Sequence, residues 1–308
     1  MIRKFKRLHQ ITHQEGIIGG LRAIQRYIIY HIWFPILKYR FERPRAGRFY
    51  VMQQDWDNLI ILDACRWDTF EEHTRFEGKL SKIISIGNES WSFQKANFSD
   101  KNLHDTVYVT ANPFSTKIAD NVFFRLISLL GEWNEDAGTV LPQSVTDAAL
   151  NAHRMYPNKR LIVHYMQPHA PHVGNYELGF NQRGWHSMTE EKDGIHLWEA
   201  VRRGYITHED LRTSYLENLR FVESEVETLI TKLPGKTVIS ADHGENLGER
   251  VLGLRFYGHG QHTPECRFVP WLELDYESRR EVIASEPVID VRPGDSTIDR
   301  RLRDLGYL

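Results

Sequence analysis

Short runs of Val, Ile and Leu alternate with longer amphipathic segments along most of the chain. Each run is bounded by polar or turn-forming residues, which predicts buried β-strands. The predicted strands are 57–62, 83–86, 107–110, 160–165 and 237–240. Apolar residues three and four positions apart predict the helices 67–76, 144–155 and 209–233. Strands that alternate with helices predict an α/β fold with a mainly parallel central sheet between layers of helices.

The size of the chain suits one large domain. It has 308 residues, of which 41% are hydrophobic, enough to bury a full core. No run of about 20 apolar residues predicts a transmembrane span, and no cleavage site marks a secretory signal. Two cysteines, Cys65 and Cys266, do not make a disulfide framework, so we expect a reducing, cytoplasmic location. The segment 175–204 has no clear period and is expected to be an insertion above the site.

The first 50 residues are predicted to form a basic amphipathic arm, although the whole chain has a formal net charge of −2. Between Ile17 and Phe41 apolar residues recur at helical spacing, and the aromatic residues have cations on both sides. Such a helix is typical of a segment that lies in the headgroup region of an anionic membrane. The alternative is an arm that packs on the domain or on a partner chain. Nucleic acid is not expected as a partner, because the aromatic residues are mixed with many aliphatic ones.

Two predicted strands are followed by side chains that suit a cation. Asp242 and His243 directly follow the strand 237–240, and Gly244 lets the chain turn sharply. Asp63 likewise follows the strand 57–62. Because ligands of parallel sheets bind at the carboxyl ends of the strands, we expect these residues to converge on one site. The ordinary alternative for each aspartate is a helix N-cap.

Six short motifs follow one another along the chain. They are Asp63-Ala64-Cys65-Arg66-Trp67-Asp68, Val109-Thr110-Ala111-Asn112-Pro113, His164-Tyr165-Met166-Gln167-Pro168-His169-Ala170-Pro171, Ala241-Asp242-His243-Gly244-Glu245, Tyr257-Gly258-His259 and Val269-Pro270-Trp271. In this order the chain resembles the alkaline phosphatase/sulfatase superfamily, and among its members the sulfatase-like proteins with an Asp-Ala-Cys-Arg box. The resemblance implies an alkaline-phosphatase-like three-layer sandwich, with residues 51–308 as a catalytic domain.

The resemblance also implies a metal site. Asp63, Asp242 and His243 are expected to hold one divalent ion, with a serine hydroxyl completing the sphere. Oxygen-rich ligation with one imidazole suits Mn²⁺ or Zn²⁺, and Mg²⁺ and Ca²⁺ are also compatible. Two-metal relatives add a further acid and two histidines. Gln167 stands where that acid is expected, so we predict one metal ion.

Family chemistry further requires a nucleophile at the metal. A formylglycine sulfatase makes it from the cysteine of a Cys-x-Pro-x-Arg motif, which neither cysteine of this chain has. Relatives that act on phosphate esters use Thr or Ser after the first Asp box, where this chain has Ser90 and Ser92. One alignment with the family pattern favours Ser90 and another favours Ser92, and Ser90 is the preferred candidate. Coordination to a cation lowers the pKa of a hydroxyl without a neighbouring base.

Other polar residues in the motifs are predicted to serve the same site. His169 is expected as a catalytic residue that donates to a phosphoryl or sulfuryl oxygen or protonates a leaving group. The expected substrate-binding residues are Arg66, Asn112, His164 and His259. Arg66 is also expected to pair with nearby carboxylates and so orient the metal ligands. The ordinary alternatives are a surface His-Pro turn at His169 and a plain Asn-Pro turn at Asn112.

Together these residues predict an enzyme that hydrolyses or transfers a phosphate-type ester. A lipid-linked or glycan substrate agrees with an arm that meets a membrane. Hydrolysis of a sulfate ester is the first alternative. The second is a non-catalytic relative with a membrane-associated binding or scaffold role, which the irregular region around Ser90 and Ser92 favours.

Overall fold

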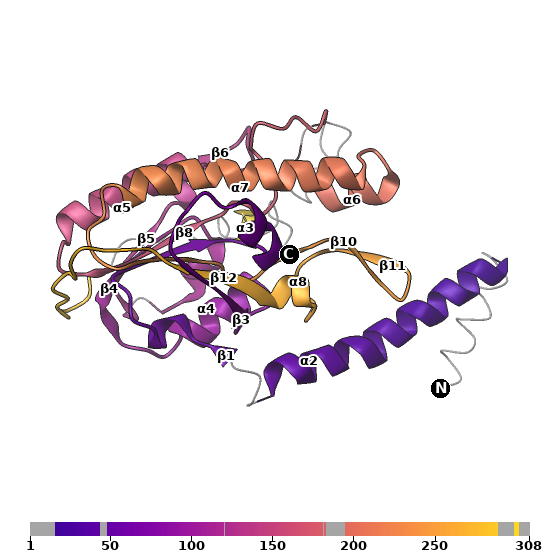
Figure 1. Ribbon diagram of the computed structural model, residues 1–308, viewed down its shortest axis with the longest axis horizontal. Coiled ribbons are helices and arrows are strands. Elements are labelled where there is room, and N and C mark those ends of the chain that lie inside the picture. Colours follow the sequence, from indigo (N-terminus) through magenta and orange to yellow (C-terminus); the bar gives the residue numbers. More distant parts are fainter. Residues whose placement is uncertain are drawn as a thin grey trace.

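The computed structural model describes residues 16–43, 48–119, 121–180, 182, 195–288 and 299–301. In this part of the chain, eight strands form one central sheet (Figure 1). In spatial order they are β1 (Arg48–Phe49), β3 (Lys79–Ser85), β12 (Phe268–Glu273), β9 (Thr237–Ser240), β2 (Asn58–Leu62), β8 (Arg160–Tyr165), β4 (Leu103–Thr110) and β5 (Phe123–Ser128). β12 is antiparallel to both of its neighbours, and the other pairings are parallel. The predicted mainly parallel sheet is confirmed.

Helices cover both faces of this sheet and give the predicted three layers. On one face lie α3 (Trp67–His73), α5 (Pro142–Met155) and α7 (His208–Ile230), and on the other lies α4 (Ser90–Phe98). Successive side chains of a strand point to opposite faces, so β2 contributes to both cores. Ile60 packs with residues of α5 and α7, whereas Leu59 packs with residues of α4. The α/β class predicted from the alternation of patterns is therefore confirmed.

Shorter elements connect these layers. The helical ones are η3 (Val51–Gln53), η4 (Pro113–Lys117), η5 (Leu130–Glu132), α6 (Leu197–Arg203) and α8 (Pro264–Arg267). Two small antiparallel sheets pair β6 (Trp133–Asn134) with β7 (Thr139–Val140), and β10 (Asn246–Val251) with β11 (Leu254–Gly258). The pair β10–β11 is a hairpin that projects from the edge of the domain (Figure 1).

Most element boundaries lie close to the predicted ones. The strands predicted over 160–165 and 237–240 have the observed bounds. The helix predicted over 67–76 ends earlier, at His73, because Thr74 is extended. The segment 175–204 was expected to be irregular but contains α6, while residues 181 and 183–194 lie outside the described residues. Neither α4 nor the β10–β11 hairpin was predicted, because neither has a periodic apolar face that is clear in the sequence.

The arm is helical over residues 16–42, where the π-turn η1 (Ile29–Trp33) leads into α2 (Phe34–Glu42). It packs on the domain through aromatic contacts: Phe34 meets Phe256 at a ring distance of 5.2 Å, and Phe41 meets Phe268 at 5.6 Å. Arg48 and Phe49, at the end of the expected arm, form β1 and pair with β3, and the bounds 1–50 and 51–308 stay a prediction. Among the described residues, no helix is both long and apolar enough to cross a membrane.

One buried carboxylate forms hydrogen bonds that connect the start of β2 with the segment that follows β12. Asp57 is fully buried and accepts hydrogen bonds from the backbone N–H of Lys236 (2.8 Å) and from Nε of Arg279 (2.7 Å). Burial by itself raises the pKa of Asp57, but the hydrogen bonds and charge of Arg279, with the backbone bond from Lys236, lower it overall. The ionised carboxylate therefore stabilises the fold.

Replacing Asp57 with Asn should lower the free energy of unfolding by about 2 kcal/mol near pH 7, since Arg279 and the backbone lose a charged acceptor. The folded-state pKa lies below the unfolded one. The loss of unfolding free energy in the Asn variant should thus be fully present above the pKa that Asp57 has in the unfolded chain. It should shrink as the pH falls through the pKa that Asp57 has in the folded protein. Denaturant unfolding from pH 7 to pH 3 measures this difference. Asp275→Asn, at an exposed position, is the control and should change stability little. An equal effect of both substitutions would contradict the role of Asp57.

Candidate metal centre and active site

The carboxyl ends of the parallel strands bring the predicted site residues to one edge of the sheet. Asp63 follows β2, Asp242 follows the adjacent β9, and His164 is the last residue but one of β8 on the other side of β2. Asn112 follows β4, and Ser90 begins α4 after β3. All five side chains are fully buried. The convergence predicted from strand order is present in the structure.

Asp63, Asp242 and His243 form a compact group with the donor atoms of a metal site. Their ligand atoms lie within 4.8 Å of one another. Nε2 of His243 is 3.4 Å from Oδ1 of Asp63 and 3.5 Å from Oδ2 of Asp242. Nε2 of His164 is 3.7 Å from Asp63 Oδ2 and 3.6 Å from Asp242 Oδ2, which brings a fourth donor atom, a second nitrogen, close to the group.

The hydrogen bonding of this group fits a cation. Among the described residues, Oδ1 of Asp63, Oδ2 of Asp242 and Nε2 of His164 have no hydrogen-bond partner. Buried polar atoms of this kind carry a large desolvation cost unless they are paired or coordinate a metal. Oxygen and imidazole ligands are those that Zn²⁺ and Mn²⁺ accept. The residues present therefore fit one divalent ion.

The electrostatics of the group point the same way. Burial by itself raises the pKa of Asp63, but the close approach and charge of His243 and the charges of the nearby His169 and His164 hold it below its usual range. Burial lowers the pKa of His243, yet the charges of Asp242 and Asp63 outweigh burial and raise it to about 10. The two carboxylates thus create a strongly negative potential at the point between the side chains, where positive charge is stabilised.

Ser90 is oriented toward this group, and Ser92 is not. The Ser90 hydroxyl donates to Asp63 Oδ2 (3.1 Å) and lies 3.3 Å from Nε2 of His243. The Ser92 hydroxyl donates to the backbone oxygen of Glu89 (2.9 Å) and accepts from the backbone N–H of Asn88 (3.2 Å). Ser92 therefore stabilises the local turn at the start of α4. The geometry favours Ser90 as the hydroxyl at the metal.

Backbone conformation brings the two aspartate loops together. Ala64 has φ +59°, a left-handed conformation that costs a non-glycine residue of order 1 kcal/mol, and its N–H donates to Asp242 Oδ1 (3.2 Å). Its carbonyl accepts from the Tyr215 hydroxyl (2.7 Å), which holds the conformation. At Gly244 a Cβ would lie 2.0 Å from the backbone oxygen of Glu265, so only glycine fits there.

Several residues expected to bind substrate instead contact the candidate ligands. Asn112 donates from Nδ2 to Asp63 Oδ2 (2.7 Å), and its Oδ1 accepts from the N–H of Phe114. His164 has Nδ1 2.7 Å from the Tyr108 hydroxyl. When the phenol accepts this bond, Nε2 keeps a lone pair on the side of the carboxylates and becomes a fourth candidate ligand. Asn112 and His164 thus contact the candidate ligand Asp63, and their role in substrate binding stays a prediction.

Arg66 also has a supporting position. Its guanidinium is buried and forms ion pairs with Asp68 (2.5 Å) and Glu249 (2.6 Å). It also donates to the backbone oxygen of Glu245 (3.1 Å). Arg66 therefore connects the first aspartate loop with the segment that follows Asp242, as expected for a residue that orients the ligands.

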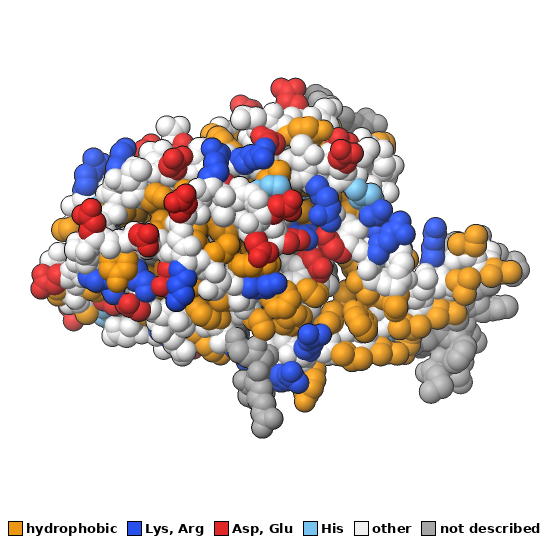
Figure 2. Space-filling model, in the orientation of Figure 1, with side chains coloured by type: hydrophobic (Ala, Val, Ile, Leu, Met, Phe, Trp, Pro, Cys, Tyr) orange, Lys and Arg blue, Asp and Glu red, His pale blue; other side chains and the backbone are white. Residues whose placement is uncertain are grey.

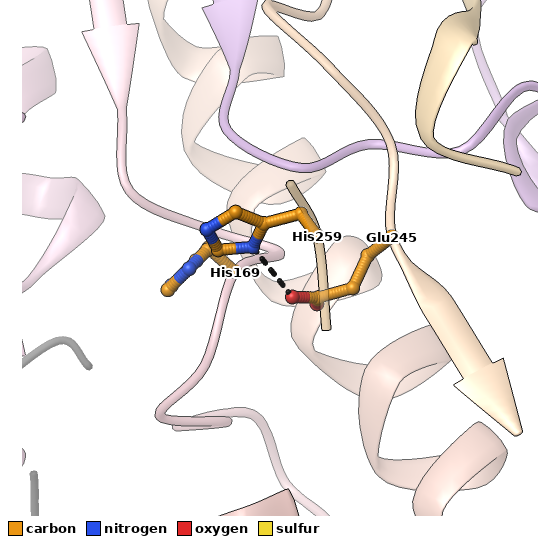
Figure 3. Close-up of side chains that lie close together, drawn as sticks. All are labelled: His169, Glu245 and His259. Carbon is orange, nitrogen blue, oxygen red and sulfur yellow. Dashed lines mark hydrogen bonds and ion pairs between the residues drawn. The ribbon is translucent and has the colours of Figure 1, made fainter. Parts of the chain in front are cut away.

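A second group of candidate ligands lies next to the first and consists of His169, Glu245 and His259 (Figure 3). Nδ1 of His259 is 3.1 Å from Oε1 of Glu245, and the His169 and His259 rings are 5.0 Å apart. The rings of His243 and His259 are 4.6 Å apart, so the two groups adjoin. Burial raises the pKa of Glu245 to about 7 and lowers that of His259 to about 3.

Glu245 is the functional candidate that sequence reasoning missed. The resemblance to two-metal relatives places the acid of a second metal site at Gln167. Nε2 of Gln167 instead donates a hydrogen bond to the backbone oxygen of Val140 (3.2 Å). Glu245 is three residues beyond Asp242, within the same motif. That spacing was the available signal. The structure thus contains a second group of candidate ligands in addition to the group for which one metal ion is predicted.

Comparisons with known proteins found structural neighbours only. No protein-family model and no curated protein sequence matches the chain. One similar structure is the soluble domain of lipooligosaccharide phosphoethanolamine transferase A from Neisseria meningitidis, with 14% identity and a TM-score of 0.47 over 76% of this chain and 79% of that one. Another is the integral membrane form of the same enzyme, with 12% identity and a TM-score of 0.49 over 89% of this chain and 59% of that one.

A third similar structure is the C-terminal periplasmic domain of EptC from Escherichia coli in complex with Zn. It has 12% identity and a TM-score of 0.46 over 71% of this chain and 72% of that one.

Replacing Asp242 with Asn should weaken metal binding by at least about tenfold, because one charged ligand becomes neutral. The melting temperature measured with saturating metal should fall toward that of the metal-free protein, since a ligand of the native state stabilises it by mass action. Elemental analysis after dialysis and a thermal scan with and without Zn²⁺ measure both effects. Asp147→Asn, on the exposed side of α5, is the control. Unchanged metal content in the Asp242 variant would contradict the assignment.

Proposed function

We propose that this chain is a metal-dependent enzyme of the alkaline phosphatase/sulfatase superfamily that hydrolyses or transfers a phosphate-type ester through Ser90. The observation that carries the proposal is the position of the Ser90 hydroxyl, 3.1 Å from Asp63 and 3.3 Å from His243. A hydroxyl at a group of buried carboxylates and imidazole matches an activated nucleophile. Asp63, Asp242 and His243 would hold the ion, with His164 as a further candidate ligand.

The residues of the chain divide the reaction between them. A bound divalent cation supplies Lewis acidity, which lowers the pKa of the hydroxyl and stabilises charge on a phosphoryl oxygen. Ser90 Oγ, after its proton has passed to solvent, attacks phosphorus, the bond from phosphorus to the leaving alcohol breaks, and the phosphoryl group is held on the serine. Water or a second alcohol then attacks phosphorus and releases Ser90. His169 and His259 adjoin the site; both are proposed to donate hydrogen bonds to the phosphoryl oxygens, and His169 is proposed to give a proton to the leaving alcohol.

Sulfate ester hydrolysis has less support. Cys65 is fully buried, and burial with nearby acidic groups raises the pKa of its thiol well above the ordinary value. A buried neutral thiol of this kind is inert, so Cys65 does not supply a nucleophile. The non-catalytic alternative was based on the irregular region around Ser90 and Ser92. The orientation of Ser90 toward the candidate ligands weakens that basis.

Ser90→Ala should lower turnover of p-nitrophenyl phosphate or bis(p-nitrophenyl) phosphate by at least about 10³-fold while metal content and fold persist, because the nucleophile is lost. Ser92→Ala is the matched control and should retain most of the activity. Assays with p-nitrophenyl sulfate, and with an added acceptor alcohol, separate sulfate from phosphate esters and transfer from hydrolysis. Full activity of both variants excludes a serine mechanism, and a wild type inactive on all three esters with metal bound supports the non-catalytic alternative.

We also propose that the arm contacts an anionic membrane and so presents the site to a lipid-linked or glycan ester. Its outward face has an apolar stripe at spacings of four and three residues, which is left exposed. The stripe consists of Ile17 (77% exposed), Leu21 (56%), Ile24 (42%), Ile28 (36%) and Ile32 (50%). Five exposed cations accompany it, and these are Arg22, Arg26, Lys38, Arg40 and Arg43. An apolar face with cations beside it fits the headgroup region of an anionic bilayer.

The double substitution Leu21→Glu with Ile28→Glu should weaken binding to phosphatidylglycerol-containing vesicles by about tenfold or more, because it places charge in the apolar stripe. Co-sedimentation of the full-length protein measures the binding. Met155→Glu with Ile283→Glu changes two comparably exposed apolar residues away from the arm and is the control. Equal binding of the wild type and both double variants would leave the arm as a packing element.

A further inference from the structure

The β10–β11 hairpin is a surface feature that emerges directly from the candidate site. Glu245 immediately precedes β10, and His259 immediately follows β11. Both residues belong to the second group of candidate ligands. The base of the hairpin is therefore part of the site, while its tip, at Leu252 and Gly253, extends away from the domain (Figure 1).

The hairpin lies beside the arm. Phe256 of β11 contacts the rings of Tyr30 (6.2 Å) and Phe34 (5.2 Å). At the tip, a Cβ on Gly253 would lie 3.8 Å from Nε2 of Gln25. The hairpin tip and the N-terminal part of the arm therefore form one continuous surface. Figure 2 shows hydrophobic side chains along the arm with Lys and Arg side chains next to it.

The tip combines an exposed apolar side chain with a pair of facing cations. Leu252 is 51% exposed and has φ +48°, so a large apolar residue occupies a turn position that favours glycine or asparagine. Arg250 and Arg255 are exposed and are direct cross-strand partners in the antiparallel register. Like charges placed opposite each other destabilise a hairpin. Both features weaken the isolated hairpin, which indicates that they serve a contact outside the chain.

More cations gather near this pair. The pKa of His208 is lowered by partial burial and then by the charges of Arg255, Arg212 and Arg250. Glu249 is the acid of β10, and both Arg66 and Arg212 pair with it. Glu249 already pairs with two arginines, so its charge does little to offset Arg250 and Arg255, and such exposed cations attract anions.

We propose that the hairpin tip is a second membrane contact, in which Leu252 enters the headgroup region and Arg250 and Arg255 bind the phosphates of anionic lipids. A bilayer is favoured as the occupant because it supplies both an apolar layer and anionic oxygens at one surface. The apolar stripe of the adjoining arm needs the same environment. Guanidinium groups suit phosphate oxygens in particular.

This contact would position the site. The segment from Asp242 to His259 has candidate ligands at both ends of the hairpin, so a tip held in the headgroup layer keeps the site close to that layer. The ester acted on would then be one presented at a membrane surface. This last step rests on the proposed function, whereas the membrane contact of the tip does not.

The test uses the full-length protein with vesicles of phosphatidylcholine, alone or mixed with phosphatidylglycerol. Arg250→Glu and Leu252→Asp should each weaken binding to the mixed vesicles by about five- to tenfold, because each removes about 1 kcal/mol or more of attraction. Arg154→Glu and Met155→Asp make the same exchanges at exposed positions of α5 and should bind as the wild type does.

A second readout separates membrane contact from misfolding. Arg250→Glu places an acid opposite Arg255, which replaces repulsion by attraction, so its melting temperature should equal or exceed that of the wild type while vesicle binding falls. Turnover of a soluble aryl phosphate without vesicles should be unchanged in both tip variants. If neither the wild type nor any variant turns over the aryl phosphate, the proposed function is refuted. The vesicle measurement then still tests the membrane contact on its own.

Two outcomes would overturn the proposal. If the tip variants bind mixed vesicles as tightly as the wild type while the arm variant does not, the arm alone makes the contact. If the wild type binds neither kind of vesicle, the surface serves a protein partner or another copy of the chain.

Discussion

The structure depends on two carboxylates, Asp63 and Asp242, buried at the ends of the adjacent strands β2 and β9. Burying negative charge is costly unless opposite charge or hydrogen bonds compensate for it. His243, His164, Ser90 and Asn112 are arranged around these carboxylates for that reason, each within 2.7–3.7 Å of a carboxylate oxygen. A divalent cation would complete the compensation, so the electrostatic requirement of the site agrees with its proposed chemistry.

Unfavourable local features occur in the loops and the hairpin near this pair. The left-handed Ala64, the close approach at Gly244 and the facing cations Arg250 and Arg255 all lie in or next to segments that bear candidate ligands. Residues with unfavourable backbone conformations or unfavourable local contacts are often found at functional sites. The layers of α5 and α7 against β4 and β8 are, by contrast, ordinary apolar packing that holds the strand ends in place.

The candidate site and the proposed membrane surface share one short segment. From Asp242 the chain passes Glu245, forms the hairpin and returns at His259. The arm packs on the same hairpin through Phe256. Catalytic chemistry and attachment are therefore proposed to be coupled by connectivity, without a separate domain between them.

The sequence by itself determined the parallel α/β architecture, because buried strands appear in a sequence as apolar runs. It also indicated the first group of candidate ligands, Asp63, Asp242 and His243, because parallel strands have their carboxyl ends at one edge of the sheet. It left Ser90 and Ser92 open, since adjacent hydroxyls differ only in the direction that α4 gives them. It did not show that His164 and Asn112 contact Asp63, and it missed Glu245. Only the tertiary structure decided these contacts, because they join strand ends and loops far apart in the chain, and spacing along a sequence does not encode the direction of a buried side chain.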